Sequence, residues 1–288
     1  MQGDVAAIFE KIGDAQVSII KDGQNEVGKR KLDDAETSYE EALKIRQALA
    51  AQAPADLERA SNVATVFEKI GDVRTSLGNY PAADAAYRQG LSVRREVAAA
   101  EPQNARGLVA LSGILARIGD VNINMGELDA ARVAYEESLV LRRRLVAADP
   151  NNSTLLTDLV GVLQKIGDLR ERMGLMREAQ QAFEEARNIR ASIDAGMNAQ
   201  RDSCRQEAGL RSRVGDPITI TFRNTYGADL RVFWLDYEGK RKFYSTIRIG
   251  SSSVQSTFLT HPWVFTDASD TCVAIYVPKA GTSEFVIR

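Results

Sequence analysis

The chain has 288 residues, of which 44% are hydrophobic and 26% are charged, and its formal net charge at pH 7 is −2. This composition is ordinary for a globular protein with room for two domains. The small net charge predicts neither a nucleic-acid partner nor a membrane surface, and no apolar run in the sequence approaches the length needed to span a bilayer.

The first two thirds of the chain carry an internal repeat. An alanine, an aromatic residue four positions later, an arginine and a proline recur with a period of 48 residues. They are Ala35, Ala83, Ala131 and Ala179; Tyr39, Tyr87, Tyr135 and Phe183; Arg46, Arg94, Arg142 and Arg190; and Pro54, Pro102 and Pro150. Unrelated residue types that share one period indicate a repeat array.

Each unit of the array predicts two helices. In the unit that starts at Pro102, this proline is expected to open the first helix, since proline is harmless at the first helical position. Gly126 is expected to end that helix, and a second helix is predicted from about Leu128 to Ala147. In the first unit, additional residues at about 22–31 predict a solvated loop.

Two glycines, an alanine and an aromatic residue stand in a fixed order in the units, as in Gly119, Gly126, Ala131 and Tyr135. This order resembles the tetratricopeptide repeat, which combines L-G-x2-Y with A-x3-F and a closing proline. The resemblance covers about residues 3–197, with the long period found in many bacterial proteins. It implies an all-α, right-handed solenoid of four helix-turn-helix units over residues 1–197, which docks a protein partner on its concave face.

The first helix of each unit carries an aspartate three positions after a lysine or arginine. The aspartates are Asp14, Asp72, Asp120 and Asp168, and the cations are Lys11, Lys69, Arg117 and Lys165. At this spacing we expect a surface ion pair within each helix. The alternative is a ladder of four carboxylates on the concave face that meets a basic or amide-rich partner. The family's carboxylate-clamp version has asparagine at these positions, which speaks against capture of a peptide C-terminus in that manner.

Residues 198–215 are a predicted linker, and from Pro217 the pattern changes to period two. Ile218, Ile220 and Phe222 alternate with polar residues, and short β-rich runs follow near 230–235, 242–247, 254–259, 271–277 and 284–287. Short strands separated by turn signals predict an antiparallel β-sandwich over residues 216–288.

A long motif lies in this β-region. It starts at Asn224, continues with Trp-Leu-x-Tyr-x-Gly (234–239) and Tyr-x-Thr-Ile (244–247), and ends with His-x-Trp-x-Phe-x-Asp-Ala (261–268). The motif resembles the β-domain of the von Hippel–Lindau tumour suppressor family over about residues 215–288. The helical domain with which that family recruits a ubiquitin ligase is missing from the sequence, so we expect no ubiquitin-ligase subunit as a partner.

In that family the β-domain binds a 4-hydroxyproline of a peptide. By position, the resemblance implies that Trp234, Tyr244 and Trp263 form an aromatic box around the proline ring, and that Thr257 and His261 bind its hydroxyl. Thr257 stands where the family has serine, and a proline directly after His261 is a second departure. The alternative is that these aromatic side chains fill a small sandwich core, with His261 bonded to a backbone carbonyl.

The two cysteines, Cys204 and Cys272, lie outside the repeats. Either they form a disulfide, which would indicate an oxidising compartment outside the cytoplasm, or they are unpaired thiols. The N-terminus shows no signal peptide, which favours the cytoplasm. Because the sequence has no metal-ligand spacing, phosphate loop or dinucleotide fingerprint, we expect no metal, no cofactor and no enzymatic activity. An enzymatic alternative would need a hydrolytic dyad at His261.

The sequence therefore predicts a two-domain, non-catalytic adaptor. In this hypothesis the solenoid docks a protein and the β-domain captures a proline-bearing peptide. A second hypothesis gives the β-domain only a structural role as a cap of the array, and leaves binding to the solenoid.

Overall fold

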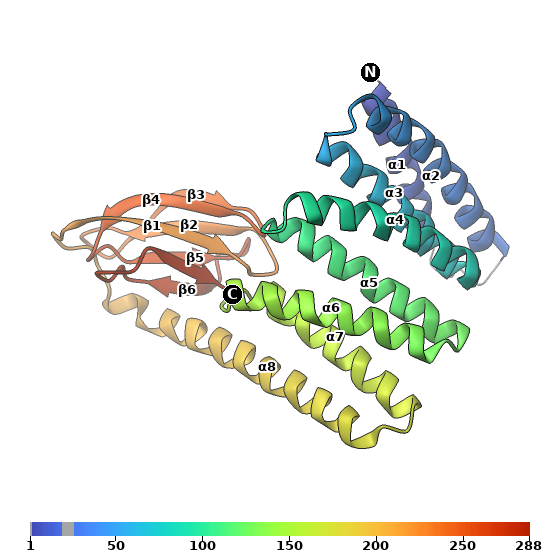
Figure 1. Ribbon diagram of the computed structural model, residues 1–288. Coiled ribbons are helices and arrows are strands. Elements are labelled where there is room, and N and C mark those ends of the chain that lie inside the picture. Colours follow the sequence, from blue (N-terminus) through green and yellow to red (C-terminus); the bar gives the residue numbers. More distant parts are fainter. Residues whose placement is uncertain (1, 19–25) are drawn as a thin grey trace. The chain divides into compact units, whose positions relative to one another are not determined.

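A computed structural model describes residues 2–18 and 26–288 (Figure 1). The helices in this part of the chain are α1 (Gln2–Ser18), α2 (Glu26–Gln52), α3 (Leu57–Ser76), α4 (Tyr80–Ala100), α5 (Ala105–Met125), α6 (Leu128–Ala148), α7 (Ser153–Arg172), α8 (Met176–Ser203) and the short 3-10 helix η1 (Cys204–Gly209). The strands are β1 (Pro217–Asn224), β2 (Leu230–Leu235), β3 (Arg241–Ile247), β4 (Ser252–Phe258), β5 (Trp263–Thr266), β6 (Cys272–Tyr276) and β7 (Glu284–Ile287). The predicted helical repeat followed by β-sheets is confirmed.

The chain forms two compact units. The first consists of Met1–Leu145 and Val162–Phe183, and the second of Val146–Gly161 and Glu184–Arg288. The first unit holds most of the repeat array, and the second holds the β-domain.

Side-chain caps and glycines set the ends of the helices. α5 begins directly after Asn104 because the Asn104 side chain accepts a hydrogen bond from the backbone N–H of Gly107 at 3.2 Å. The expectation that Pro102 opens this helix is wrong, since Pro102 lies in the preceding turn. α5 ends before Gly126, whose φ of 80° is the left-handed conformation that glycine adopts without strain, as expected.

The additional residues of the first repeat are helical in their second half. Residues 22–25 of the predicted loop lie outside the described residues, whereas residues 26–31 belong to α2. The loop prediction is therefore wrong for 26–31. Lysine and arginine at 29–31 are good helix formers, and Glu26 stands where a negative charge stabilises the start of a helix.

A glycine and an aromatic ring pack the two helices of each repeat together. A Cβ added to Gly119 of α5 would lie 2.3 Å from the ring of Tyr135 of α6, which is closer than real contacts allow. Only glycine lets the ring lie against the α5 backbone at this position. The same relation holds for Gly13 with Tyr39, Gly71 with Tyr87, and Gly167 with Phe183.

The hydrophobic core of the array lies between successive repeats. Val66 and Ile70 of α3 form one buried cluster with Leu32 and Tyr39 of α2. In the same way α5 packs with α4, and α7 packs with α6. The first helix of each repeat thus completes the core of the repeat before it, as in other solenoids.

α5 is the one helix in the described ranges that is long and apolar enough to cross a membrane. The expectation that no apolar run approaches the length of a membrane span is therefore wrong for α5, by length and composition. Of its apolar window, 56% is buried inside the protein, and Ile114 and Leu115 belong to the core between repeats. Packing in the array therefore accounts for its hydropathy.

The β-domain consists of two sheets packed on a common core. One sheet has the strand order β4-β1-β7 and the other β3-β2-β5-β6. All neighbouring strands are antiparallel except β1 and β7, which pair in parallel and so differ from the predicted antiparallel sandwich. The sequence analysis also missed β5, because all four of its residues are buried and show no alternation.

Asn224, the first residue of the long motif, is buried at the end of β1. Its side-chain N–H groups donate to the carbonyls of Ala228 and Ile247, each at 2.9 Å, and its side-chain oxygen accepts from the backbone N–H of Tyr226. A buried amide is tolerated when its groups are bonded in this way. Asn224 therefore fixes the loop between β1 and β2.

Residues after α8 cover the outer face of the β3-β2-β5-β6 sheet. Cys204 of η1 is joined to Cys272 of β6 by a disulfide, with Cα atoms 6.0 Å apart. Leu210 packs beside them against Leu235 and its neighbours. The predicted linker 198–215 begins inside α8, which ends at Ser203, and then follows the sheet through η1.

Candidate functional site

The five residues that the sequence assigns to a pocket lie in one cluster of the β-domain. β2 and β5 place Trp234 directly opposite Trp263. The ring of Tyr244 from β3 meets Trp263 edge-on, with centroids 5.2 Å apart. The indole N–H of Trp263 donates to the hydroxyl of Thr257 from β4 at 3.1 Å. His261, in the turn before β5, stacks on Trp234 with centroids 5.5 Å apart and planes at 19°.

This aromatic cluster has a buried floor and an exposed rim. Trp263 and Thr257 are only 3% and 5% exposed, whereas Tyr244 is 52% exposed. A plain core accounts for Trp263, which also contacts Phe222 between the sheets. It does not account for Tyr244, because a tyrosine that only fills a core would not leave half its surface in water.

Two further rings belong to the rim, and the sequence analysis did not assign them. Phe258 lies 4.9 Å and Tyr237 5.9 Å from the imidazole of His261, measured between ring centroids. Both residues are exposed, Phe258 to 42% and Tyr237 to 58%. Tyr237 stands inside the quoted motif and Phe258 directly follows Thr257, so their positions were visible, but their direction depends on the turns that end β2 and β4.

The imidazole of His261 makes ring contacts but no hydrogen bond to any residue in the described ranges. The bond to a backbone carbonyl considered in the sequence analysis is therefore not formed. Partial burial lowers the pKa of His261 below its ordinary value, so the ring is neutral at pH 7. A neutral imidazole offers one donor and one acceptor nitrogen, a pair that an alcohol group matches.

An open groove of about 300 Å³ lies beside the cluster, along β1 and β4. It is lined by Pro217, Ile218, Thr219, Ser256, Thr257 and Phe258. Because Thr257 and Phe258 belong to both the groove and the cluster, a chain that fills one can continue into the other. In the described part of the protein, no three His, Cys, Asp or Glu side chains stand together for a metal ion.

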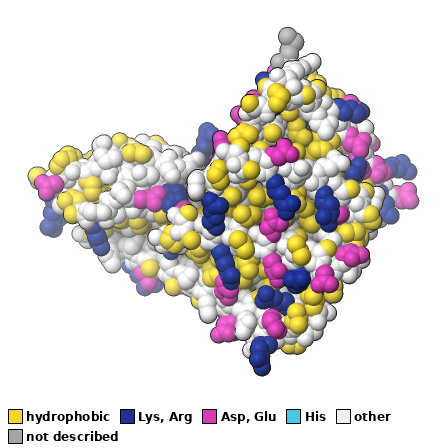
Figure 2. All heavy atoms as spheres, in the orientation of Figure 1, with side chains coloured by type: hydrophobic (Ala, Val, Ile, Leu, Met, Phe, Trp, Pro, Cys, Tyr) yellow, Lys and Arg dark blue, Asp and Glu magenta, His cyan; other side chains and the backbone are white. Residues whose placement is uncertain are grey.

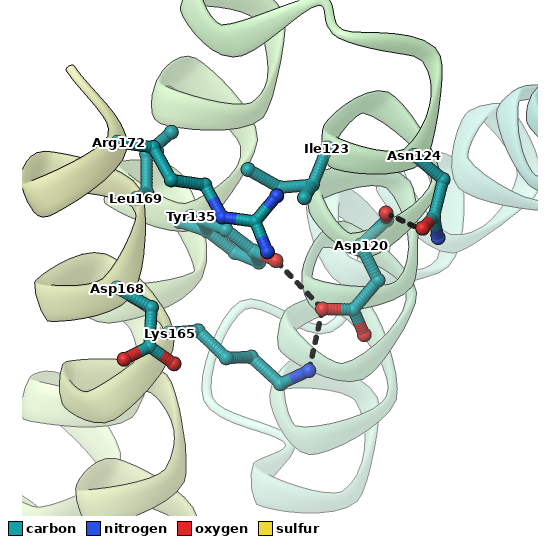
Figure 3. Close-up of a pocket in the computed structure, with 8 residues that line it drawn as sticks. All are labelled: Asp120, Ile123, Asn124, Tyr135, Lys165, Asp168, Leu169 and Arg172. Carbon is teal, nitrogen blue, oxygen red and sulfur yellow. Dashed lines mark hydrogen bonds and ion pairs between the residues drawn. The ribbon is translucent and has the colours of Figure 1, made fainter.

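The aspartates of the repeat array are paired across repeats. Asp120 accepts a hydrogen bond from the hydroxyl of Tyr135 at 2.6 Å and another from Lys165, in the first helix of the next repeat, at 2.5 Å (Figure 3). The equivalent sets are Asp72 with Tyr87 and Arg117, and Asp14 with Tyr39 and Lys69. The expected ion pairs within each helix are wrong, because the tyrosine holds each carboxylate on the side that faces the next repeat.

These contacts shift the pKa of the three tyrosines and of Asp14. Burial raises the pKa of the three tyrosines, and the hydrogen bond to the aspartate raises it further. Burial alone would raise the pKa of Asp14, but the hydrogen bonds from Lys69 and Tyr39 outweigh it and lower the pKa. Three of the four aspartates are thus paired with a cation of the next repeat, so they do not form a free acidic ladder. Figure 2 shows positive and negative side chains intermixed over the visible face of the repeat helices.

Two equivalent pockets lie one repeat apart along the array. One, of about 220 Å³, is lined by Asp120, Ile123, Asn124, Tyr135, Lys165, Asp168, Leu169 and Arg172 (Figure 3). The other, of about 350 Å³, is lined by Asp72, Thr75, Ser76, Tyr87, Arg117, Asp120 and Val121. In the first pocket Asp168 is exposed and has no hydrogen bond or ion pair within the described residues. The repeat of Asp168 has Phe183 at the position where the earlier repeats have the tyrosine.

Residues 209–278 match the family model of the VHL beta domain, and residues 112–144 match that of a tetratricopeptide repeat. The chain joins tetratricopeptide repeats to a VHL-type β-domain. The VHL match contains all five predicted pocket residues, from Trp234 to Trp263. No curated protein sequence matches the chain.

Solved structures similar to this chain are helical-repeat proteins. BtubC (BKLC) from P. vanneervenii is 19% identical with a TM-score of 0.50, over 66% of this chain and 64% of that one. The designed repeat protein DHR64 is 17% identical with a TM-score of 0.42, over 67% and 96%, and MamA is 20% identical with a TM-score of 0.32, over 65% and 92%. The chain spans less than two thirds of BtubC, and this likeness shows the helical-repeat fold alone.

A tetratricopeptide-type fold is typically non-catalytic and generally binds protein partners. Together with the VHL-type β-domain, it fits a role in protein interaction. No Ser, Thr or Cys side chain in the described ranges is hydrogen-bonded to the ring of His261, and both cysteines are in the disulfide. The dyad that the enzymatic alternative requires is therefore not assembled here.

Proposed function

We propose that this protein is a non-catalytic adaptor whose VHL-type β-domain holds a proline-bearing peptide while its repeats dock a protein partner. The observation that carries the proposal is the position of His261. Its neutral ring lies on the indole of Trp234 between exposed aromatic side chains, with its nitrogen atoms unbonded within the described residues. Such a group is ready to bind a ligand.

The chemistry of the cluster favours a hydroxylated proline ring. Proline rings pack well on aromatic faces, and proline-bearing segments are already extended. The oxygen of Thr257 accepts from the Trp263 N–H, so its own hydroxyl hydrogen stays free to donate. Together with His261, it offers two contacts to one ligand hydroxyl.

The expected preference for hydroxylated over plain proline follows from these two contacts. Neutral hydrogen bonds contribute about 0.5–1.5 kcal/mol each, so two contribute about 1–3 kcal/mol. This corresponds to roughly a 5- to 150-fold difference in Kd. A site that leaves the same groups unpaired beside plain proline loses this amount.

Tryptophan fluorescence of the full chain tests the proposal. The protein has two tryptophans, and both stand in the cluster, so the signal reports on this site without a label. Titration with matched proline and 4-hydroxyproline peptides should give a saturable change that is stronger for the hydroxylated peptide. Tyr244→Ala should weaken it, whereas Phe243→Ala should not, since Phe243 is similarly exposed but packs on Phe233 instead. No response to either peptide would refute the proposal.

A second candidate is that the β-domain only braces the repeats. Within the second unit, Arg223 of β1 pairs with Asp149 after α6, and the Ser153 hydroxyl at the start of α7 donates to Thr225 at 3.0 Å. These contacts favour a structural role and are compatible with binding as well. The fluorescence titration distinguishes the two candidate functions, because a purely structural β-domain gives no saturable response to either peptide.

We also propose an oxidising compartment, on the strength of the bonded Cys204 and Cys272. Such pairs persist outside the reducing cytoplasm. Thiol titration of protein purified without reductant from its native source tests this: no reactive thiol is expected, and two reactive thiols would contradict it.

A further inference from the structure

The first helix of the array exposes residues that the other repeats bury. Val5, Ile8 and Ile12 of α1 are 42%, 56% and 42% exposed. The residues at the same repeat positions are at most 6% exposed; they are Val63, Val66 and Ile70 in α3, Leu111, Ile114 and Ile118 in α5, and Leu159, Val162 and Ile166 in α7. α1 thus carries the apolar face of an internal helix, although no described helix covers it.

In the interior of the array, the second helix of the preceding repeat covers this face. Ile114 and Ile118 of α5 share one buried cluster with Ala83, Tyr87 and Leu91 of α4. The face of α1 therefore has the shape and chemistry to receive a helix of the α4 type. Such a helix presents a small residue and an aromatic ring one turn apart.

The opposite end of the first unit exposes this kind of surface. Met176, at the start of α8, is 62% exposed, whereas Leu32 at the same position in α2 is 2% exposed. Phe183 is only partly buried, whereas Tyr135 at the same position is 3% exposed. In the earlier repeats, the first helix of the following repeat covers these positions.

The charges at the two ends are complementary. In the interior, each cation of a first helix binds the aspartate one repeat earlier, as Lys69 binds Asp14 at 2.7 Å. The described repeats form three such pairs, which are Lys69 with Asp14, Arg117 with Asp72 and Lys165 with Asp120. Lys11 is exposed and has no partner within the described residues, and Asp168 is the carboxylate left over at the other end.

We infer that the two ends of the array bind each other in separate copies of this chain, head to tail. α1 of one copy covers the Met176–Phe183 face of the next, and Lys11 pairs with Asp168 as Lys69 pairs with Asp14. A symmetric contact between two α1 helices would instead bring Lys11 near its own counterpart and leave Asp168 open. Because a head-to-tail contact uses two different surfaces, it propagates into an open series of oligomers.

Sedimentation velocity of the full chain over a range of concentrations tests this inference. The wild type should form a concentration-dependent series of species that shortens at high salt, since the ion pair is screened. Ile8→Asp should abolish the series. Val140→Asp is the matched control, because Val140 is 66% exposed but lies on α6, away from both ends.

Charge reversal decides between the two geometries. Lys11→Glu and Asp168→Lys should each weaken association about five- to tenfold, because each replaces an attraction by a repulsion. The double variant, in which every chain carries both substitutions, should recover the association. In it the ion pair between neighbouring copies is restored with reversed sign. A wild type that stays monomeric at all concentrations overturns the inference. So does a closed dimer whose stability Asp168→Lys leaves unchanged.

Discussion

Gly119→Ala should destabilise the repeat array although alanine is the better helix former. The new Cβ would lie 2.3 Å from the ring of Tyr135, whereas ordinary contacts begin at 3.4 Å, so the ring has to move by about 1.1 Å. A shift of this size breaks the hydrogen bond of 2.6 Å from Tyr135 to Asp120. Overpacking costs about 1–3 kcal/mol and loss of a hydrogen bond to a charged group about 1.5–3 kcal/mol. Helix propensity offsets about 1 kcal/mol, which leaves a net loss of roughly 1.5–5 kcal/mol.

Gly113→Ala in the same helix is the matched control. A Cβ at this position meets only the Arg117 side chain, at 3.7 Å, which is ordinary contact. The substitution should therefore stabilise the array by about 0.5–1 kcal/mol through helix propensity alone. Tyr135→Phe separates the hydrogen bond from the clash, since Phe183 shows that a phenyl ring fits at this position.

Urea unfolding followed by far-UV circular dichroism measures all three variants. Gly119→Ala should shift the unfolding midpoint to a lower urea concentration, and Gly113→Ala should shift it to a higher one. Tyr135→Phe should also lower the midpoint, but less than Gly119→Ala does. A Gly119→Ala protein as stable as the wild type would show that the ring adapts without loss, and the reasoning on glycine and ring packing would be wrong.

Three further predictions concern the β-domain. Asn224→Ala should cost about 2–4 kcal/mol in thermal unfolding, because the carbonyls of Ala228 and Ile247 and the backbone N–H of Tyr226 lose their partners; an unchanged melting temperature would contradict the assigned role. His261 is the only histidine, and its folded-state pKa lies below the ordinary value of about 6.5. Stability should therefore be constant above about pH 6.5 and decrease as the pH falls through the folded pKa, and His261→Phe should remove this decrease. The bond between Cys204 and Cys272 closes a loop of 68 residues, so reduction should lower the stability of the unit by about 4 kcal/mol; no effect of reductant on melting would argue against the bond.

The period of the repeat made the helical part predictable. Residues such as Gly119 and Tyr135 recur together because one packing contact recurs, so the sequence carries that contact four times. Features that occur once were harder to predict. Pro102 resembles the first residue of a helix, yet α5 begins after Asn104, because the Asn104 side chain accepts a hydrogen bond from a backbone N–H of the first turn.

The partners of the aspartates could not be chosen from the sequence. Asp120 has Arg117 three positions before it and Lys165 one repeat later, and both spacings are regular. Only the packed structure shows that Tyr135 holds the carboxylate toward Lys165.

In the β-domain, the residues chosen from the motif lie in one cluster, but the motif does not predict how exposed each of them is. The pairing of β2 with β3 shifts register between Val232 and Phe233, so alternation along the strands does not tell which ring faces the core. Trp263 is therefore on the floor and Tyr244 on the rim, a distinction that no periodicity contains. Phe258 joins the rim because β4 ends there and the chain turns back to His261.

The proposed hydrogen bond between His261 and the hydroxyl of a bound proline ring is tested most directly by a double-mutant cycle. One change of the cycle is made in the protein and the other in the peptide. The Kd values of the proline and 4-hydroxyproline peptides are measured for the wild type and for His261→Phe, which keeps a ring on Trp234 but removes both nitrogen atoms. We expect the wild type to prefer the hydroxylated peptide at least fivefold. In the variant this preference should fall by about 2- to 13-fold, the share of one neutral hydrogen bond, and only the contact with Thr257 should remain. An equal preference in both proteins, or none in the wild type, would contradict it.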